Sequence, residues 1–300
     1  MTTLQAIEGG AGTPGGTSTP TTDAPAATRT KSALAAPDVI LAALYLAAVV
    51  VSALAPWLLA PHDPLAVHPE LTLLPPTSAH PLGTDESGRD LLSRMIYGAG
   101  PSLSMGLGAT AIGVTGGSVL GLLAGLGNRF VEVVVMRFLD IGLAFPELLL
   151  ALVVITFGGR STFDALLAVG VASIPSYARL VRAQILTVRG TPYVEAAYSL
   201  GYSRAAVIRR HILPNALKPL IVLATIGIGS AIAAGASLSF LGLGSQPPSP
   251  EWGAILATGR NFIGRAWWEV LFPAVAITLT VISVTVIGRA VSRHLEGRIR

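Results

Sequence analysis

The sequence predicts an all-α polytopic membrane protein with six transmembrane helices. Of the 300 residues, 52% are hydrophobic and only 12% are charged, whereas an average soluble domain has about 25% charged residues. Several uncharged apolar runs reach about 20 residues, the length that crosses a bilayer. Lys and Arg are also divided unequally between the connections, as in membrane proteins with a fixed orientation. A very apolar soluble protein is the alternative, but it does not explain the long uncharged runs.

The first 36 residues differ in composition from the rest of the chain. They are rich in Gly, Thr, Pro and Ala, and such a segment cannot bury a hydrophobic core. It is not a secretory signal, because the first apolar run starts too late and is too long. We therefore predict a disordered cytoplasmic tail at 1–36 and a transmembrane domain at 37–300.

Hydropathy places all six spans in the transmembrane domain at 37–300. Pro37 and Asp38 are a helix start signal for the first of them. Pro146 and Pro175 interrupt the third and fourth, and prolines are tolerated in spans where neighbouring groups satisfy the freed backbone. The predicted spans lie at about 39–60, 103–126, 138–158, 163–183, 219–242 and 269–288.

The basic residues orient these spans. With the N-terminus inside, the inner segments hold 15 Lys and Arg residues and the outer segments hold 5. Positive residues collect on the cytoplasmic side of membrane proteins. Both termini are therefore predicted in the cytoplasm, together with the connection between spans four and five.

Several function classes are not supported by the sequence. There is no cysteine, so disulfides and thiolate chemistry are absent. The chain has no GxxxxGK[ST] phosphate loop, no HExxH and no GxSxG, so we expect neither ATP hydrolysis nor protease activity from it. The spacing of His62, His68 and His80 is irregular, and no metal site is predicted. The basic pI of 9.8 is assigned to membrane orientation rather than to nucleic acid.

A glycine stripe runs along the second span. Glycine recurs every fourth residue, at Gly113, Gly117, Gly121 and Gly125. Small residues at this spacing let another helix approach closely. The stripe predicts either packing within this chain or a surface used by another subunit.

The connection between spans four and five predicts two short helices. Thr191 and Pro192 form a helix start, and Glu195 lies in the first turn, where the helix dipole favours a negative charge. One narrow apolar face is expected at Tyr193, Ala196, Ala197 and Leu200.

Gly201 is expected to end the first of these helices and Ser203 to cap the second. In the second helix Ala205, Ile208 and Ile212 align. Pro214, after Leu213, is expected to stop it. The pair predicts either an interfacial amphipathic hairpin or a docking element for a cytoplasmic partner.

The segment "EAAYSLGYSRAAVIRRHILPNAL", residues 195–217, resembles the EAA loop of ABC importer permeases. Glu-Ala-Ala, the glycine and the Leu-Pro pair match at the required spacing. His211 stands where the general pattern has Ile, and "RHILPNAL" resembles the dipeptide, oligopeptide and nickel branch. "HPLGTDESGRDLLSRMIYGAGPSL" and "SFLGLGSQPPSPEWGAIL" resemble two further segments of that branch.

The resemblance implies a type I ABC importer permease fold with cytoplasmic coupling helices. It implies a pore shared with a second homologous permease subunit, two ATPase subunits or one fused ATPase that bind ATP and Mg, and an extracytoplasmic peptide-binding protein. It implies that this chain itself holds no cofactor and has no enzymatic activity. The expected location is the bacterial inner membrane, in contact with lipid. The residues carried over to ATPase docking are Glu195, Ala196, Ala197, Leu200, Gly201, Ser203, Arg204, His211, Leu213 and Pro214.

The implied function is uptake of di- or oligopeptides. A permease for nickel or another small solute of the same branch is the alternative. An ion-coupled secondary transporter or a structural membrane protein is also compatible with the composition, but neither explains the EAA-like loop.

Two outer segments carry further candidates. They form either a self-paired, glycine-hinged loop or a gate that contacts a binding protein. The residues concerned are Gly83, Thr84, Asp85, Gly88, Arg89, Asp90, Glu251 and Trp252. Trp252, Trp267 and Trp268 are expected as interfacial anchors.

Two acidic residues fall within the third span. Asp140 and Glu147 are seven apart and are expected on one helix face. Ionisable residues in a membrane point to function, and both are candidates for pore lining. Asp140 is alternatively paired with Arg137 or with another subunit.

Overall fold

The computed structural model describes residues 37–158 and 161–297, and in this part of the chain the regular structure is helical. The predicted disordered tail at 1–36 lies outside the described residues. The α-helices are α1 (Pro37–Leu54), α2 (Leu91–Leu126), α3 (Arg129–Leu143), α4 (Glu147–Ile155), α5 (Thr162–Arg189), α6 (Pro192–Ser199), α7 (Arg204–Val207), α8 (Leu213–Phe240), α9 (Trp252–Gly259) and α10 (Trp268–Gly297).

Five helices among the described residues are long and apolar enough to cross a membrane. A sixth span results if the bent pair α3 and α4 crosses as one broken unit. The segments are Pro37–Leu54, Leu91–Leu126, Thr162–Arg189, Arg204–Phe240 and Trp268–His294. The prediction of a polytopic helical protein is confirmed, and the third span departs most from its predicted form.

The predicted third span, 138–158, is not one helix. α3 ends at Leu143, and α4 begins at Glu147 after a bend of 93°. Pro146 occupies the N-cap of α4, and because proline lacks an N–H and restricts the residue before it, the helix breaks there. Asp140 and Glu147 therefore do not share a helix face, which corrects that prediction.

The other span boundaries shift where local signals act. α1 ends at Leu54, before Pro56, rather than near 60. α2 begins at Leu91 instead of 103, because Asp90 caps it by accepting a hydrogen bond from the Ser93 amide. α5 continues to Arg189 rather than 183, and Pro175 lies inside it.

The glycine stripe of α2 packs against α5 of the same chain. A Cβ on Gly117 would lie 2.4 Å from the Tyr177 Cβ and 2.9 Å from the Ala178 amide nitrogen. A Cβ on Gly113 would meet Ser173 and Tyr177, and one on Gly125 would meet Ile185. Of the two predicted uses, packing within the chain is confirmed, since α5 covers the stripe.

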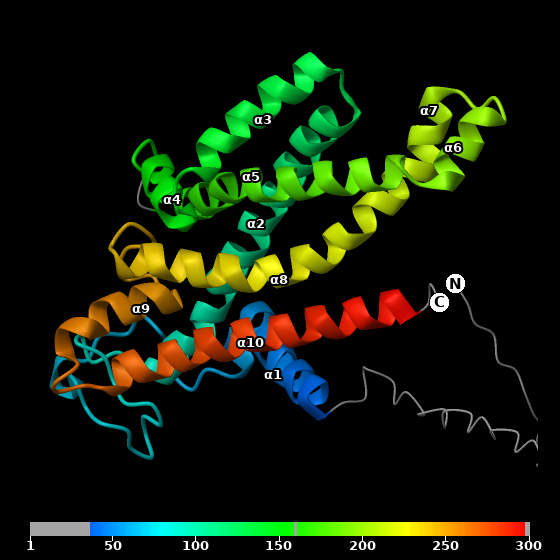
Figure 1. The fold of residues 1–300 in the computed structure, drawn as a ribbon. Coiled ribbons are helices and arrows are strands. Elements are labelled where there is room, and N and C mark those ends of the chain that lie inside the picture. The colour runs from blue at the N-terminus through cyan, green and yellow to red at the C-terminus, as the bar shows by residue number, and fades with distance from the viewer. Residues whose placement is uncertain (1–36, 159–160, 298–300) are drawn as a thin grey trace, which may run out of the picture. The chain divides into compact units, whose positions relative to one another are not determined.

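Figure 1 shows how the remaining helices frame this pair. α2 packs against both α5 and α8, and α10 packs against α8 and α1. α6 and α7 form a short hairpin at one end of α5 and α8, while α9 and the loops between α1 and α2 lie toward their other end. The two predicted functional regions are thus at opposite ends of the long helices.

Candidate functional site

The loop between α5 and α8, which we call the EAA loop (residues 191–214), folds largely as its turn signals predict. α6 starts at Pro192 after Thr191 in an extended conformation. The Thr191 hydroxyl donates back to the Val188 carbonyl instead of capping α6. Gly201 has a φ of +84°, and Ser203 accepts a hydrogen bond of 3.3 Å from the Ala206 amide. The left-handed conformation at the turn is one that glycine adopts without strain.

The predicted stop at Leu213 and Pro214 is wrong. A π-helical turn at Ile208–Ile212 joins α7 directly to α8, and the whole of Arg204–Phe240 forms one candidate span of 37 residues. Pro214 follows the π turn directly and lies in the first turn of α8, so it does not end the helical run.

The π turn also changes which side chains of the EAA loop face inward. Val207 and Ile212 are buried, whereas Ala205 is exposed, so the predicted alignment of Ala205, Ile208 and Ile212 does not hold. A π turn adds one residue to a helical turn, which shifts the register of every later side chain. Val194 and Ala197 on α6 join Val207 and Ile212 in one buried cluster.

Two arginines fix the EAA loop to the end of α2. Arg189 Nη1 donates to the Gly125 carbonyl at 2.7 Å, and Arg204 Nη2 donates to the Leu126 carbonyl at 3.0 Å. α2 ends at Leu126, so these carbonyls lie at a helix C-terminus, where they lack α-helical partners and carry partial negative charge. Arg189 precedes α6 and Arg204 follows it in the sequence, so the two bonds hold both ends of α6 near the end of α2.

Part of α6 and its C-cap residue Leu200 are exposed. Glu195 and Ala196 are exposed, and Leu200 is 78% exposed. The Glu195 side chain has no hydrogen bond or ion pair in the part of the chain that is described. The predicted apolar face is therefore split, because Ala197 turns inward while Tyr193 and Leu200 face out.

His211 lies within a small aromatic group on the EAA loop. Its ring centroid is 6.2 Å from that of Tyr193 and 6.3 Å from that of Tyr202. Asn215 Nδ2 donates to the Tyr193 hydroxyl at 3.2 Å and to the His211 carbonyl at 2.8 Å. His211 and Leu213 are partly buried, whereas Pro214 is exposed. His211 thus joins α6 to the π turn.

At the opposite end, the loop at Thr84–Asp90 is paired with itself and with α2. Asp85 Oδ2 lies 2.7 Å from Arg89 Nε and 3.3 Å from Arg94 Nε. Asp85, Arg89 and Arg94 are all at most 5% exposed. Gly88 has a φ of +73°, and a Cβ there would lie 1.8 Å from the His68 carbonyl oxygen. The self-paired, glycine-hinged form predicted from the sequence is the one observed.

Thr84 and Gly83 connect this loop to α10. Thr84 is fully buried, its hydroxyl donates to the Leu71 carbonyl, and its carbonyl accepts a hydrogen bond of 3.0 Å from Trp268 Nε1. A Cβ on Gly83 would lie 2.8 Å from the same indole nitrogen. These side chains are enclosed within the chain, so a partner protein reaches them only through their exposed neighbours.

Glu251 and Trp252 are also buried. Glu251 caps α9 by accepting hydrogen bonds from the Gly253 and Ala254 amides at 2.8 and 2.9 Å. Burial raises the pKa of the Glu251 carboxyl and the two amide bonds lower it, with a net rise above the usual range. Trp252 Nε1 donates to the Met95 carbonyl at 2.8 Å.

The prediction of interfacial tryptophans is wrong for two of the three. Trp252 is 3% exposed and Trp268 is 4% exposed, and both belong to a buried cluster. Their indole N–H groups bind backbone carbonyls, as buried Trp residues usually require. Trp267 alone, at 51% exposure, keeps the predicted setting.

Two ion pairs join α3 to α5. Arg179 Nη2 lies 2.7 Å from Asp140 Oδ1, so within the described residues Asp140 pairs with Arg179 rather than with Arg137. Arg182 forms a second pair with Glu132. The sequence contains a sign of these pairs. Arg179 and Arg182 are one turn apart on α5, which places them on the same side of that helix. Glu147 begins α4 with an exposed side chain.

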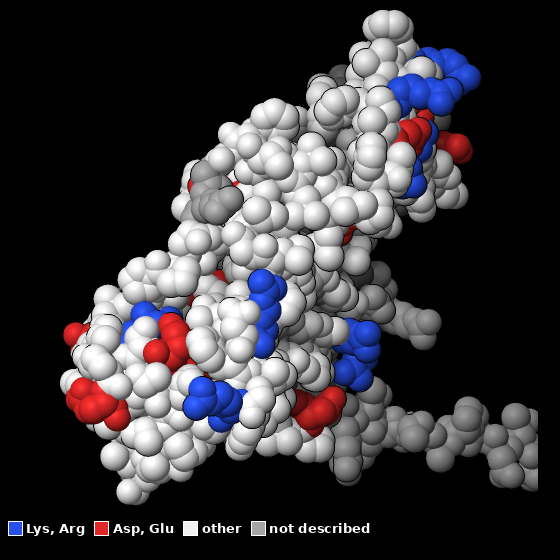
Figure 2. Space-filling model, turned by 90° about the vertical axis from the view of Figure 1, so that its left-hand side faces the viewer, with Lys and Arg blue, Asp and Glu red and all other residues white. Residues whose placement is uncertain are grey.

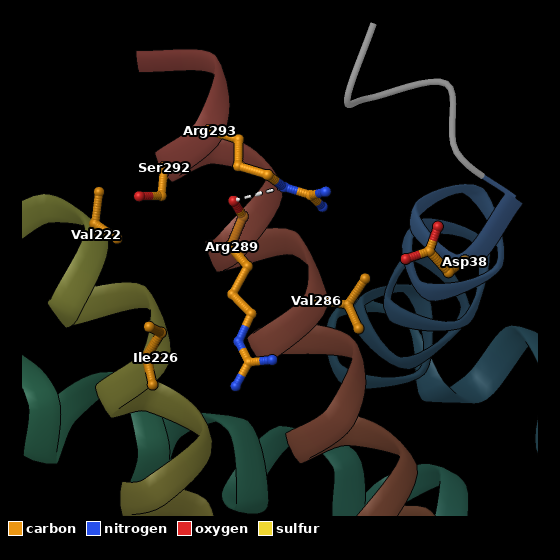
Figure 3. Close-up of a pocket in the computed structure, with 7 residues that line it drawn as sticks. All are labelled: Asp38, Val222, Ile226, Val286, Arg289, Ser292 and Arg293. Atoms are coloured by element: carbon orange, nitrogen blue, oxygen red, sulfur yellow. Dashed lines mark hydrogen bonds between the residues drawn. The ribbon is translucent and has the colours of Figure 1, made fainter. Parts of the chain in front are cut away.

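A pocket that the sequence did not predict lies between α1, α8 and α10 (Figure 3). Its volume is about 490 Å³. Arg289 and Arg293 have no ion pair among the described residues, and Arg293 Nε donates to the Arg289 carbonyl at 3.4 Å. The lining residues are Asp38, Val222, Ile226, Val286, Arg289, Ser292 and Arg293.

The fold and these sites define a multi-pass helical membrane protein. Figure 2 shows a largely uncharged surface on which the charged residues form a few separate groups. Two solved structures of ABC importers have this fold. A chain of the MetNI methionine ABC transporter matches with a TM-score of 0.58 and 21% identity, over 68% of this chain and 97% of that one. A chain of an amino acid ABC transporter crystallised with histidines matches with a TM-score of 0.57 and 20% identity, over 68% and 94%.

The chain belongs to the family described as binding-protein-dependent transport system inner membrane component, whose model matches residues 117–300. The probable D,D-dipeptide transport system permease protein DdpC of Escherichia coli is 45% identical over 81% of each chain. The di/tripeptide transport system permease protein DppC of Pseudomonas aeruginosa is 41% identical over 82% of this chain and 83% of that one. The glutathione transport system permease protein GsiD of Pectobacterium atrosepticum is 40% identical over 75% of each.

Proposed function

We propose that this chain is a pore-forming subunit of an ATP-driven importer of di- or oligopeptides, and that a cytoplasmic ATPase docks on its EAA loop. The observation that carries the proposal is the exposed outer surface of α6. Glu195, Ala196 and Leu200 are free there, while the inward residues of the loop are packed into the chain. A rigidly held surface with unpaired groups is suited to bind a preformed groove.

The loop is built to pass movement on to the spans. Arg189 and Arg204 fix it to the end of α2, and the π turn continues it into α8 without a break. When ATP and Mg bind to the partner ATPases and these close, the loop, α2 and α8 move with them. The substrate site then opens alternately to the two sides, without ATP chemistry in this chain.

The partners follow from the same arrangement. A second homologous permease subunit completes the pore, and Glu147, exposed at the start of α4, is a candidate to line it. An extracytoplasmic peptide-binding protein contacts the end of the molecule that carries α9 and the Thr84–Asp90 loop. Exposed neighbours such as Ile263 and Trp267 provide that contact, since Asp85, Arg89 and Glu251 are enclosed.

The location that fits these partners is the bacterial inner membrane with both termini in the cytoplasm. In that orientation the C-terminal end of α10 lies at the inner surface, and positive residues are favoured there. The pocket beside Arg289 and Arg293 then faces the headgroup region, where lipid phosphates offer partners to the two guanidinium groups.

The substrate class rests on the relatives, whose names refer to dipeptides, di- or tripeptides and glutathione. Nickel or another small solute is the second candidate, carried by the resemblance of "RHILPNAL" to a branch that includes nickel permeases. Calorimetry of the partner binding protein decides between them. Heat on addition of a dipeptide or a longer peptide supports the proposal, whereas heat on addition of Ni²⁺ alone contradicts the peptide assignment.

Docking is tested by purifying the tagged chain from its host and measuring the ATPase that accompanies it. Leu200→Glu places a charge on the outer surface of α6, and we expect it to release the ATPase while leaving the chain in the membrane. Val67→Glu is the matched control, since Val67 is 57% exposed and lies in the loop between α1 and α2. ATPase retained by Leu200→Glu at the wild-type level contradicts docking at this surface.

A further inference from the structure

Three residues far apart in sequence meet beside the first turn of α2. Asp90 Oδ1 lies 2.9 Å from His80 Nδ1, and Asp90 Oδ2 lies 3.7 Å from His62 Nδ1. One ligand atom from each residue lies within 4.8 Å of the other two. The imidazole centroids are 5.0 Å apart and tilted by 35°. Two ring nitrogens and a carboxylate thus face a common point.

The spacing matches the edges of a tetrahedral metal site. Zinc binds histidine nitrogen and carboxylate oxygen at about 2.0–2.1 Å, so two ligands of a tetrahedral site are about 3.3 Å apart. The separation from His80 Nδ1 to Asp90 Oδ1 is 2.9 Å and that from His62 Nδ1 to Asp90 Oδ2 is 3.7 Å, one on either side of this value. The His62 side chain is 45% exposed, so its ring has room to turn toward the carboxylate.

The surroundings hold two of the three ligands in place and leave one side open. The side chains of His80 and Asp90 are only 13% and 2% exposed. Ser93 donates its amide and its hydroxyl to Asp90 Oδ2 at 2.8 and 2.7 Å, and such outer contacts orient metal ligands. The three residues line a pocket of about 160 Å³, which leaves room for a water molecule as a fourth ligand.

The His62 segment is attached to the same turn through its backbone. The His62 amide donates to Ser93 Oγ at 3.0 Å, so the imidazole is near Asp90 even without a cation. His68 lines the same pocket, but its Nδ1 is 3.4 Å from Glu70, and it lies outside the group of three. His68 therefore offers a control residue of the same type in the same pocket.

We propose that His62 Nδ1, His80 Nδ1 and the Asp90 carboxylate bind one divalent cation of the zinc class. Neutral imidazole and carboxylate are ligands that suit such ions. Binding replaces the hydrogen bond between His80 Nδ1 and Asp90 Oδ1, and the single proton of the neutral His80 ring then sits on Nε2. The cation joins the loop between α1 and α2 to the start of α2. The site is independent of ATPase docking and of the transported substrate.

The test uses the full-length chain, purified in detergent and treated with a chelator. Titration with Zn²⁺ is expected to give one bound ion per chain. His62→Ala is expected to weaken binding at least about tenfold, as the loss of a single ligand does in protein sites, whereas His68→Ala is expected to leave it unchanged. Zn²⁺ is also expected to raise the melting temperature of the wild type but not of His62→Ala.

Co²⁺ provides a readout of geometry, since a tetrahedral Co²⁺ site absorbs visible light strongly. The proposal predicts such bands in the wild type and their loss in His80→Ala. If His80→Ala does not fold, His62→Ala still decides, because the His62 side chain is 45% exposed and, among the described residues, its polar and ring interactions are with Asp90 and the His80 ring. The proposal is overturned if the wild type binds no Zn²⁺, or if His68→Ala weakens binding as much as His62→Ala.

Discussion

Arg204 Nη2 donates to the carbonyl oxygen of Leu126 at 3.0 Å, which joins the second helix of the EAA loop to the last turn of α2. The two residues are 78 positions apart. Arg189 makes the equivalent bond to Gly125 at 2.7 Å. Because α2 contacts α5 and α8 along its length, a force applied at the loop reaches three membrane helices through one helix end.

The first prediction concerns this anchor. Arg204→Gln shortens the side chain and removes the charge that favours a helix C-terminus. In the reconstituted transporter we expect peptide uptake per ATP hydrolysed to fall by about threefold, the scale of one partly exposed charged hydrogen bond. Hydrogen exchange of the α6 amides should become faster at the same time.

Arg209→Gln is the matched control for this anchor, since Arg209 is exposed on the same loop and has no partner among the described residues. Equal uptake per ATP in the two variants would show that the bond to Leu126 plays no part in coupling.

A second prediction concerns the turn at Gly201. A Cβ there would meet nothing within 4 Å, but the φ of +84° strains any β-branched side chain. Gly201→Val is therefore expected to disturb the turn by about 1–2 kcal/mol and to lower uptake while membrane insertion persists. Gly201→Asn adds similar bulk and tolerates this conformation, so it should keep most of the activity. If uptake by the Asn variant falls as far as that by the Val variant, backbone strain is not the cause.

The glycine stripe gives a third prediction. In Gly117→Ala the new Cβ would lie 2.9 Å from the Ala178 backbone nitrogen, and overpacking of this kind costs about 1–3 kcal/mol. We expect a lower melting temperature of the detergent-solubilised chain. In Gly100→Ala the nearest atom is at 3.5 Å, so that variant of the same helix should melt at or above the wild-type temperature. A Gly117→Ala variant as stable as Gly100→Ala would mean that α2 and α5 separate freely.

The fourth prediction is a pH dependence. The folded chain raises the pKa of Glu251 above its ordinary value of 4.5, chiefly because the carboxyl is buried. The folded state therefore binds this proton more tightly than the unfolded state, and the contribution to stability is lost as pH rises from the ordinary value through the raised one.

Glu251→Gln removes this titration, so it provides the comparison. The melting temperature of the wild type minus that of the variant should become smaller as pH rises above the ordinary carboxyl value of 4.5, whatever its sign at the start. A difference that stays constant, or that grows with pH, would contradict a raised pKa at Glu251.

The parts of the site that depend on local chemistry could be predicted from the sequence. Pro192, Gly201 and Ser203 each act within a few residues, and α6, the turn and α7 follow from them. Thr191 occupies the predicted N-cap position, but its hydroxyl donates to the Val188 carbonyl instead. Pro214 misled the prediction because its effect depends on what precedes it. The π turn at Ile208–Ile212 places it at the start of α8, and nothing in hydropathy signals a π turn.

The burial of side chains and the grouping of residues far apart in sequence depend on contacts between distant segments, which the sequence does not reveal. Hydropathy cannot tell a membrane-facing tryptophan from a buried one, so it predicts Trp252 and Trp268 at the interface, whereas both are buried. His62, His80 and Asp90 approach one another only because two loops return to the first turn of α2, and their irregular spacing gave no sign of this. The bend at Pro146 separated Asp140 from Glu147, whose seven-residue spacing assumed an unbroken helix.

The continuous run from Arg204 to Phe240 has a mechanical consequence. Its 37 residues extend about 55 Å at 1.5 Å per residue. Figure 1 shows this curved segment linking the EAA loop to the region near α9. A rotation of about 5° at one end displaces the other by at most about 5 Å at this length, nearly the rise of one helical turn. A rotation too small to alter the local contacts of α7 thus moves the far end of α8, and with it the pore at the other side of the membrane.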